Sequence, residues 1–411
     1  VRHGERVKKA PLPFTTSTLQ QEASKVLNFS TQKTMRLAQQ LYEGVDIKGE
    51  GTVGLITYLR TDSTRVSEEA ETQAAEFIDV HYGEKYKTAA ATEKKNSQKI
   101  QDAHEAIRPT DLNRMPIAIK EQLPRDLFRL YQLIWKRFVA SRMSAAQYDT
   151  TSVKIQAKDQ IFTLAASRMR FDGFMSVYTQ EDDKEEENVL GGNLDENSVL
   201  EFQSFDPKQH FTQPPAHYTE ASLVRKLEEL GIGRPSTYAP TISTVQQRGY
   251  VVKGNSEGVK RPYEILKLKG NKITETVKTE TTGNEKSKLL PTDVGIVVND
   301  FLMSFFPEIM DYNFTASVEK EFDEVAEGEK EWTSVMKNFY DGFHPLVDKT
   351  MNAKSEHKVG ERILGNDPVS GKPTFNVRLG DITAPEYTIE EIFEYLEKAD
   401  RRCIVVIDEF Q

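Results

Sequence analysis

The sequence contains almost no cysteine. Cys403 is the only one among 411 residues, so an intramolecular disulfide is impossible and a zinc site built from several thiolates is excluded. Long apolar runs are also lacking, and no stretch approaches the roughly 18 residues that a membrane span needs. The chain starts at Val1 without a basic segment followed by an apolar one, so no signal peptide is indicated. We therefore expect a cytoplasmic fragment without membrane association.

The chain also lacks an excess of basic residues. It has 54 basic and 64 acidic residues, a formal net charge of −10, so its overall charge does not attract polyanions and any nucleic-acid site must be local. Acidic residues gather at 181–187 and 308–331, which we interpret as solvated surface, while basic residues gather at 92–108 and 224–262. With 37% hydrophobic and 29% charged residues, the composition is that of a globular protein of two to four domains.

Hydrophobic periodicity divides the chain into segments of different type. A helical pattern dominates as far as residue 146, with one helix capped by Ser30 and closed by Gly44 and a long amphipathic helix over 126–142. The apolar run 53–59 predicts a buried strand or strand-like turn. From residue 147 the period changes to two, which predicts antiparallel strands at TTSVKIQA, IFTLAAS and MSVYTQ, with turns at 158–159 and 172–173.

A proline-containing linker, 206–216, separates this β-rich part from a second helical part. Two helices are predicted between Thr219 and Gly249, the second capped by Ser236, and 250–269 predicts a hairpin. Helix, turn, helix and hairpin together indicate a winged-helix-like unit. The domains that we expect are 1–17 (a remnant strand), 18–146 (helical, carrying Tyr58), 147–213 (β-rich), 214–350 (helical base), 351–380 (the start of a repeat) and 381–411 (a tail).

The segment 56–67, ITYLRTDSTRVS, is the first candidate for chemistry. A tyrosine hydroxyl has an ordinary pKa of about 10, so a tyrosine nucleophile needs a neighbouring cation or base. In an extended chain Arg60 would lie on the same side as Tyr58, where its guanidinium suits both a phenolate and a phosphate. Asp62 continues this face and could orient Arg60 or hold the proton of a leaving oxygen. The alternative is that Tyr58 is a packing residue in an apolar strand.

A second candidate is the segment 103–110, AHEAIRPT. His104 and Arg108 are four residues apart and would share one face of a helix, which places an imidazole beside a guanidinium, a pair suited to a phosphate. Pro109 would end the turn. The alternative is a capped helix end in which Glu105 and Arg108 form a surface ion pair.

A third candidate is the segment 218–250, in which basic side chains are interleaved with hydroxyl and aromatic groups. This pattern suits a groove that follows a nucleic-acid backbone and stacks unpaired bases. An ordinary pair of packed helices explains the pattern equally well. The residues concerned are Arg225, Lys226, Arg234, Thr237, Tyr238 and Arg248.

Taken together and in this order, the motifs resemble the type IA DNA topoisomerases, especially bacterial topoisomerase I. The resemblance covers roughly residues 13 to 350. The matching segments are 13–23 (PFTTSTLQQEA), 54–67 (GLITYLRTDSTRVS), 102–112 (DAHEAIRPTDL), 218–251 (YTEASLVRKLEELGIGRPSTYAPTISTVQQRGYV), 289–302 (LLPTDVGIVVNDFL) and 311–329 (DYNFTASVEKEFDEVAEGE).

The resemblance implies an isomerase that breaks and rejoins DNA. It implies that Tyr58 forms a 5′-phosphotyrosyl bond with one strand, that Arg60 and His104 support this reaction, and that Thr237 and Arg248 contact single-stranded DNA. A second strand would pass through the break, relaxing negative supercoils without ATP. The implied fold is a multidomain α+β toroid with a helical gate domain, a β-rich arch and a helical, winged-helix-like base, in a monomer.

Two features depart from the family pattern. In the family an N-terminal Toprim domain supplies an acidic magnesium site, a glutamate and a lysine, and none of these precedes Val1. The resemblance therefore implies that Mg²⁺ serves the full-length family while its ligands are absent from these residues, so that the fragment would be inactive or very weak. The alternative function is a non-catalytic module that binds single-stranded DNA.

The end of the chain departs as well. Residues 362–380 resemble the start of a cysteine-free C-terminal repeat, and Gly371–Lys372 fits a hairpin turn better than a phosphate loop, because Pro373 replaces the required Ser or Thr. In the tail, Asp408 and Glu409 follow an apolar run and resemble the Walker B end of an ATPase. Without a Walker A motif in the sequence, an ATPase is the weakest of the three functions considered.

Overall fold

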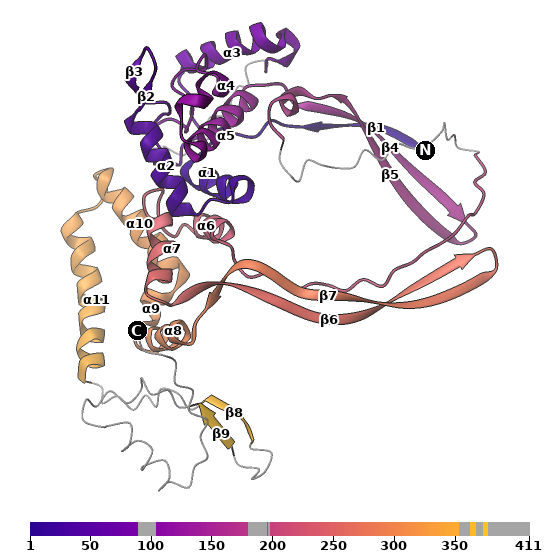
Figure 1. Ribbon diagram of the computed structural model, residues 1–411. Coiled ribbons are helices and arrows are strands. Elements are labelled where there is room, and N and C mark those ends of the chain that lie inside the picture. The colour runs from indigo at the N-terminus through magenta and orange to yellow at the C-terminus, as the bar shows by residue number, and fades with distance from the viewer. Residues whose placement is uncertain (89–103, 180–194, 196–197, 353–361, 367–372, 377–411) are drawn as a thin grey trace. The chain divides into compact units, whose positions relative to one another are not determined.

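The computed structural model describes residues 1–88, 104–179, 195, 198–352, 362–366 and 373–376 (Figure 1). The chain forms two compact units, Val1–Met336 and Lys337–Gln411. All candidate site residues named above lie in the first unit. The tail at 381–411, with Asp408 and Glu409, lies outside the described residues.

Helices are the main regular structure of the described residues up to 145, and several of their ends follow from local capping. The side chain of Ser30 accepts a hydrogen bond from the backbone N–H of Lys33, and Gly44 ends the same helix with a φ of 127°, as the sequence predicts. The helices are α1 (Thr16–Glu22), continued by a π-helical turn (Ala23–Leu27), α2 (Thr31–Glu43), α3 (Glu68–Tyr82), α4 (Pro116–Ile119) and α5 (Arg125–Ser141), with short 3₁₀ turns at Glu84–Tyr86, Lys120–Gln122 and Gly173–Ser176.

The main hydrophobic core lies among these helices. Helix α5 contributes the largest share, because its apolar positions recur at helical spacing and are buried against α2 and the segments around residues 14, 56 and 107. Phe14, Tyr131 and Phe138 are among the largest side chains that are fully buried. This core is the support on which the Tyr58 segment rests.

A three-stranded antiparallel sheet, in the order β1-β4-β5, contains β1 (Arg2–Lys8), β4 (Ala146–Ala157) and β5 (Gln160–Phe171). The predicted turn at 158–159 is confirmed, and Lys158 adopts a left-handed conformation there. Of the two alternatives for 53–59, the strand-like turn is found: β3 (Gly51–Val53), paired with β2 (Val45–Ile47), ends before Tyr58, and the chain then bends around a single bridge at Ile56. The third strand expected at 175–180 was wrong, because a 3₁₀ turn forms there and Tyr178 packs into the core.

The second helical part begins with α6 (Glu220–Glu229) and α7 (Tyr238–Gln247). The predicted hairpin at 250–269 was wrong in extent: β6 (Val251–Lys269) is a single strand, and its antiparallel partner is β7 (Lys272–Pro291). The two strands run together as one long ribbon (Figure 1). The turn falls at Gly270, where φ is 59° and glycine is favoured.

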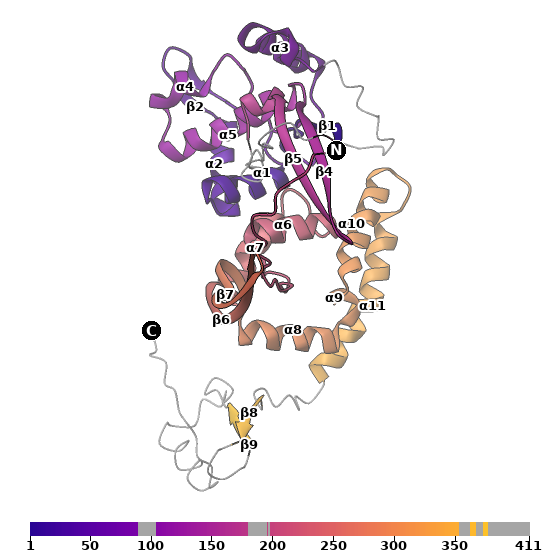
Figure 2. The same ribbon diagram turned by 90° about the vertical axis from the view of Figure 1, so that its right-hand side faces the viewer.

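Four more helices follow the ribbon (Figure 2). Their bounds are α8 (Asp293–Phe305), α9 (Pro307–Met310), α10 (Tyr312–Ala326) and α11 (Trp332–Asn352). The strands β8 (Arg362–Asn366) and β9 (Pro373–Asn376) pair in antiparallel orientation, while the turn predicted at 371–372 lies outside the described residues. Among the described residues, no helix is both long and apolar enough to cross a membrane. The predicted mixture of helices and antiparallel strands is confirmed, and the domain boundaries stay predictions.

Candidate active site

Tyr58 lies on an irregular segment that is held from two sides. On one side, the Thr16 hydroxyl donates to the carbonyl of Leu59 at 2.7 Å and accepts from the N–H of Thr61 at 2.9 Å. On the other side, the N–H of Thr57 donates to the carbonyl of Arg108 at 2.9 Å. Because both flanks are fixed to buried backbone, the position of the phenol ring is set by the fold.

The ring of Tyr58 is half-buried between two other rings. Its centroid lies 4.7 Å from that of His104, with the planes 38° apart, and 5.4 Å from that of Tyr42 in an edge-to-face arrangement. The imidazole of His104 is exposed to solvent. The structure therefore brings together Tyr58 and His104, two residues 46 positions apart in the sequence, next to open solvent.

His104 reaches Tyr58 by a route different from the predicted one. No helix joins His104 to Arg108. The chain is extended there, with isolated bridges between Ile56 and Pro109 and between Phe14 and Ile107. The side-by-side pairing of two distant segments, rather than helical spacing, places the imidazole against the phenol.

Arg108 is occupied by contacts within its own segment. Its guanidinium lies 2.7 Å from the Glu105 carboxylate and also donates to the carbonyl of Pro109 at 3.1 Å. Burial alone would raise the pKa of Glu105, but the hydrogen bond and charge of Arg108 outweigh it and lower that pKa. The ion pair expected in the alternative interpretation is thus present, and Arg108 is a support of the segment rather than a partner of Tyr58.

Arg60 and Asp62 both lie at the surface. The chain bends at Thr57, Leu59 and Arg60, so the regular extended chain expected to align Arg60 with Tyr58 is not formed. Within the described part of the chain, Arg60 forms no ion pair with Asp62. Burial is the main cause of the raised pKa of Tyr238, and the charge of Asp62 adds to it, which places the Tyr58 segment near α7.

Three of the residues proposed to contact DNA, Arg225, Arg234 and Thr237, form contacts with other residues of the protein. Arg234 lies 3.3 Å from Glu319 and 3.1 Å from Asp323, both on α10, and Arg225 lies 2.9 Å from Glu229 on its own helix. Each cation is therefore partly neutralised. The hydroxyl of Thr237 accepts from the N–H of Arg234 at 2.9 Å, which fixes the turn before α7; the helix starts after Thr237 and not, as predicted, after Ser236.

Tyr238 does not offer a stacking surface in this conformation. Its side chain is only 7% exposed and packs with Val224 and Ile242 in a second, smaller hydrophobic core. Burial, with the nearby carboxylate of Glu228, raises the pKa of Tyr238 to about 12. The prediction that Tyr238 stacks against bases is therefore not supported in this conformation. A ring that is enclosed by protein cannot receive a base on its face.

Arg248 is the best-placed cation of this group. It follows the last turn of α7, is exposed, and forms no ion pair with any residue that the structure describes. A guanidinium in this state keeps its full charge and its donors for a phosphate. Arg60 shares these properties, so one open cation lies next to Tyr58 and another at the end of α7.

The described residues do not fit the magnesium site of the family. No three His, Cys, Asp or Glu side chains among them are arranged to hold a metal ion.

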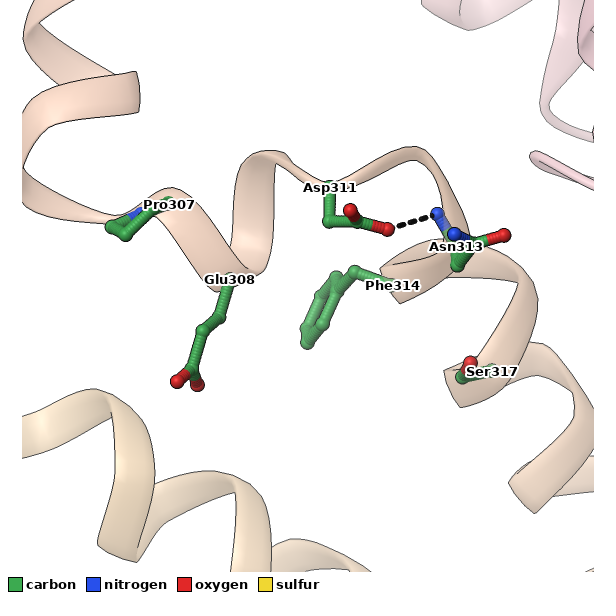
Figure 3. A pocket seen from close by; sticks show the side chains of 6 residues that line it. All are labelled: Pro307, Glu308, Asp311, Asn313, Phe314 and Ser317. Carbon is green, nitrogen blue, oxygen red and sulfur yellow. Dashed lines mark hydrogen bonds between the residues drawn. The ribbon is translucent and has the colours of Figure 1, made fainter.

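Two hollows in the described part of the chain differ in the charge of the side chains that line them. The first, at α9 and α10, is shallow, and its charged side chains, Glu308 and Asp311, are both acidic (Figure 3). The Asp311 carboxylate caps α10 by accepting from the N–H of Asn313 at 2.7 Å. A phosphate would be repelled there. The second, a cavity of about 500 Å³ beside the start of α6, mixes acidic and basic side chains.

The sequence analysis did not identify three residues that hold the site together. Thr16 fixes the Tyr58 segment, and Glu220 and Glu228 of α6 bind the helices that carry it. The spacing of eight residues between the two glutamates, with Val224 midway, is a signal for one helical face. Their partners, however, are about 190 to 210 positions away, and no local pattern in one sequence identifies such partners.

The sequence and the fold are both similar to those of known proteins. The profile of the DNA topoisomerase family matches residues 1–284 and 271–337, which together are most of the chain. Full-length topoisomerase I from Thermotoga maritima is 35% identical to this chain and superposes on it with a TM-score of 0.70. The match covers 91% of this chain. The chain spans 55% of the length of that protein. The motifs, the mixed helical and sheet fold and both matches agree, and the chain belongs to the type IA DNA topoisomerase family.

Proposed function

We propose that this chain carries the nucleophile and part of the DNA-binding surface of an enzyme that breaks one DNA strand, passes another strand through the break and rejoins it. The observation that carries the proposal is the contact between Tyr58 and His104 on a segment held by Thr16. A half-buried phenol with an open side, beside an imidazole, is the arrangement that a tyrosine nucleophile requires.

The reaction exchanges one phosphate ester for another. The hydroxyl oxygen of Tyr58 attacks the phosphorus, the P–O bond to the 3′ oxygen breaks, and a 5′-phosphotyrosyl bond forms. The phenol loses its proton and the departing 3′ oxygen gains one. Rejoining reverses these steps, so no ATP is consumed and negative supercoils can relax.

The neighbouring side chains have distinct proposed roles. The imidazole of His104 is near enough to the phenol ring to hold the phosphate or exchange a proton there. Arg60, exposed two residues further on, supplies charge to the phosphate after a rotation of its side chain. Arg248 at the end of α7 binds the backbone of the same strand.

The test is a covalent adduct assay. The protein is incubated with a labelled single-stranded oligonucleotide, with and without Mg²⁺, and then denatured, and a small yield of DNA–protein adduct is expected. Tyr58→Phe should abolish it, because no oxygen remains to attack. Tyr42→Phe is the matched control, since that ring touches Tyr58 and is 40% exposed. An adduct that survives in Tyr58→Phe would refute the assignment.

A second candidate function is a non-catalytic module that binds single-stranded DNA. It is favoured by the absence, among the described residues, of a group able to hold a metal ion. Salt-sensitive binding without any adduct in the wild-type protein would support it. Under either function the protein is proposed to act as a monomer in the compartment that holds the DNA, the cytoplasm.

A further inference from the structure

Beside the contact of Tyr58 with His104, four polar side chains meet in a second cluster. Its members are Arg65, Ser67, Glu105 and Arg108. We call it the Glu105 cluster, because the other three side chains all act on the carboxylate of Glu105. Glu105 directly follows His104 in the sequence, and Ser67 is the N-cap of α3. The cluster therefore connects the chain next to the imidazole with the start of a helix.

The carboxylate of Glu105 is bound on several sides. The Nε atom of Arg108 donates to its Oε2 atom at 2.7 Å, and another nitrogen of the same guanidinium donates to the Ser67 hydroxyl at 3.5 Å. Burial raises the pKa of Glu105, but the hydrogen bonds and charges of its neighbours outweigh burial and lower that pKa. Glu105 is therefore charged at neutral pH. The side chains of Glu105 and Arg108 are only 20% and 14% exposed, so this ion pair is more firmly held than one at the surface.

The backbone that follows Glu105 is held by other groups. The N–H of Ala106 donates to the carbonyl of Arg65 at 2.8 Å, and the carbonyl of Ala106 accepts from the Thr57 hydroxyl at 2.7 Å. The same hydroxyl accepts from the N–H of Arg108 at 3.0 Å. These bonds fix the chain from Ala106 onwards, and the side chain of Glu105 extends the support by one residue, toward the imidazole.

The imidazole of His104 depends on such a support because it is exposed to solvent. Its ring lies 4.7 Å from that of Tyr58, and the direction in which the ring leaves the chain is set by the backbone at residues 104 and 105. A displacement of about 1 Å at a reacting group can cost about 100-fold in rate. A contact that fixes this backbone therefore affects the reaction as well as the fold.

We infer that Glu105 is a positioning residue for His104. Bound by Arg108 and by the start of α3, its carboxylate holds the adjacent backbone so that the imidazole stays against the phenol of Tyr58. The consequence for catalysis rests on the proposed function. The contact between the two rings exists without DNA and is measured without it.

The first test observes the imidazole by nuclear magnetic resonance. Histidine rings are labelled with ¹³C at Cε1 in the deuterated wild-type protein, and the signal of His104 is identified by its loss in His104→Gln. A neighbouring aromatic ring displaces the signals of protons that lie above its face or at its edge. The Hε1 signal of His104 should therefore be displaced from its position in an unfolded chain, and Tyr58→Leu should remove most of the displacement.

The variants of the cluster should have the same effect on this signal. Glu105→Ala and Arg108→Ala should each remove most of the displacement, because either change opens the ion pair. The double variant should lose no more than the single variants, since two groups that act as one unit are not additive. Glu105→Gln keeps the length of the side chain and an oxygen that accepts from Arg108, so it should lose less than Glu105→Ala.

Two controls separate positioning from a general loss of structure. Asp126→Ala removes a carboxylate that pairs with Lys33 and with Arg129, three residues further along its helix, and it should leave the signal of His104 in place. The ring of His81 packs on Phe77 of α3 at 4.2 Å. The signal of His81 should therefore stay unchanged in every variant of the cluster that folds.

The second test places Glu105 in the reaction. Glu105→Ala should lower the rate of adduct formation by about tenfold or more in protein that has His104. In the His104→Ala background the same change should have no further effect, because Glu105 acts through the imidazole. A wild-type protein that forms no adduct would count against the proposed function alone, since the first test needs no DNA cleavage.

Three results would overturn the inference. An unchanged His104 signal in Glu105→Ala would show that the carboxylate does not position the ring. Equal movement of the His81 and His104 signals in Glu105→Ala would show that it supports the whole domain. A further loss of rate in the His104→Ala background would show that Glu105 acts by another route. If Arg108→Ala fails to fold, the comparison of Glu105→Ala with Glu105→Gln still decides between these outcomes.

Discussion

The rings of Tyr58 and His104 lie 4.7 Å apart, although the two residues belong to distant segments that are joined by isolated backbone bridges and a few hydrogen bonds rather than by a continuous sheet. The imidazole is exposed, while the phenol is half-buried and rests on a segment fixed by Thr16. A substrate phosphate can therefore approach both groups from the solvent side without any movement of the core.

The first prediction concerns His104. His104→Ala should lower the rate of adduct formation by about 100-fold, the lower end of what a positioned acid or base contributes. Quenched time courses with a labelled oligonucleotide measure the rate. His81→Ala is the control, because its ring packs on Phe77 of its own helix at 4.2 Å. An equal loss in both variants would mean that the effect is one of stability.

The second prediction concerns the support below Tyr58. Thr16→Val keeps the shape of a fully buried side chain but removes the hydroxyl that binds Leu59 and Thr61. The free energy of unfolding should fall by about 2 kcal/mol, since a buried carbonyl and a buried N–H lose their partner.

Urea denaturation monitored by circular dichroism measures this change. Thr72→Val is the matched control, because its hydroxyl binds the carbonyl of Glu68 on an exposed helical surface, and it should change stability by less than about 0.5 kcal/mol. Equal stability of Thr16→Val and the wild-type protein would show that the segment is held by other contacts.

Local signals in the sequence predicted local structure well. Ser30 and Gly44 delimit α2 because capping depends on the few residues at a helix end, and the turn at Lys158 follows from the alternating segments that flank it on both sides. The length of β6 could not be predicted, since an alternating polar strand of this kind is stabilised by its partner β7 and not by its own apolar pattern.

Contacts between distant segments account for the errors at the site. The pattern AHEAIRPT favours a helix, yet bridges from Ile107 to Phe14 and from Pro109 to Ile56 make the chain extended there. Arg234 appeared to be a free cation because its acidic partners, Glu319 and Asp323, lie about 85 to 89 positions further on. Tertiary pairing of this kind outweighs local propensity, and only coordinates reveal it.

The third prediction concerns Arg248. Because it is exposed and forms no ion pair within the described residues, Arg248→Ala should weaken binding of single-stranded DNA several-fold and reduce the slope of log K against log salt by about 0.7, the value for one phosphate contact. Fluorescence anisotropy over a salt series measures both quantities.

Arg225→Ala provides the comparison for Arg248. Its guanidinium is already paired with Glu229 at 2.9 Å, so its loss should change the slope by less than half as much. If Arg248→Ala leaves both affinity and slope unchanged, the strand does not follow α7, and the proposed DNA-binding surface is wrong.

The fourth prediction is that the stability of the folded protein depends on pH through the carboxyl group of Glu220. Burial alone would raise the pKa of its carboxyl group, but the hydrogen bonds from Lys253 and Thr31 outweigh burial and hold that pKa below its ordinary value of 4.5. A carboxylate with a lowered pKa stabilises the folded state above its unfolded pKa, and this contribution is lost as the pH falls through the folded value. Other charged groups near it, Glu22, Lys25 and Arg225, line the adjoining cavity.

Glu220→Gln should therefore destabilise the protein by about 2 kcal/mol at pH 7, where the wild-type carboxylate is charged and hydrogen-bonded. The difference from the wild-type protein should narrow as the pH is lowered from about 4.5 and should be smallest below the folded pKa. Urea denaturation across this range measures the difference, with Glu229→Gln as a control that changes little at any pH. A difference between Glu220→Gln and wild type that stays constant with pH would show that the charge of Glu220 does not stabilise its contacts with Thr31 and Lys253, because only a charge effect disappears on protonation.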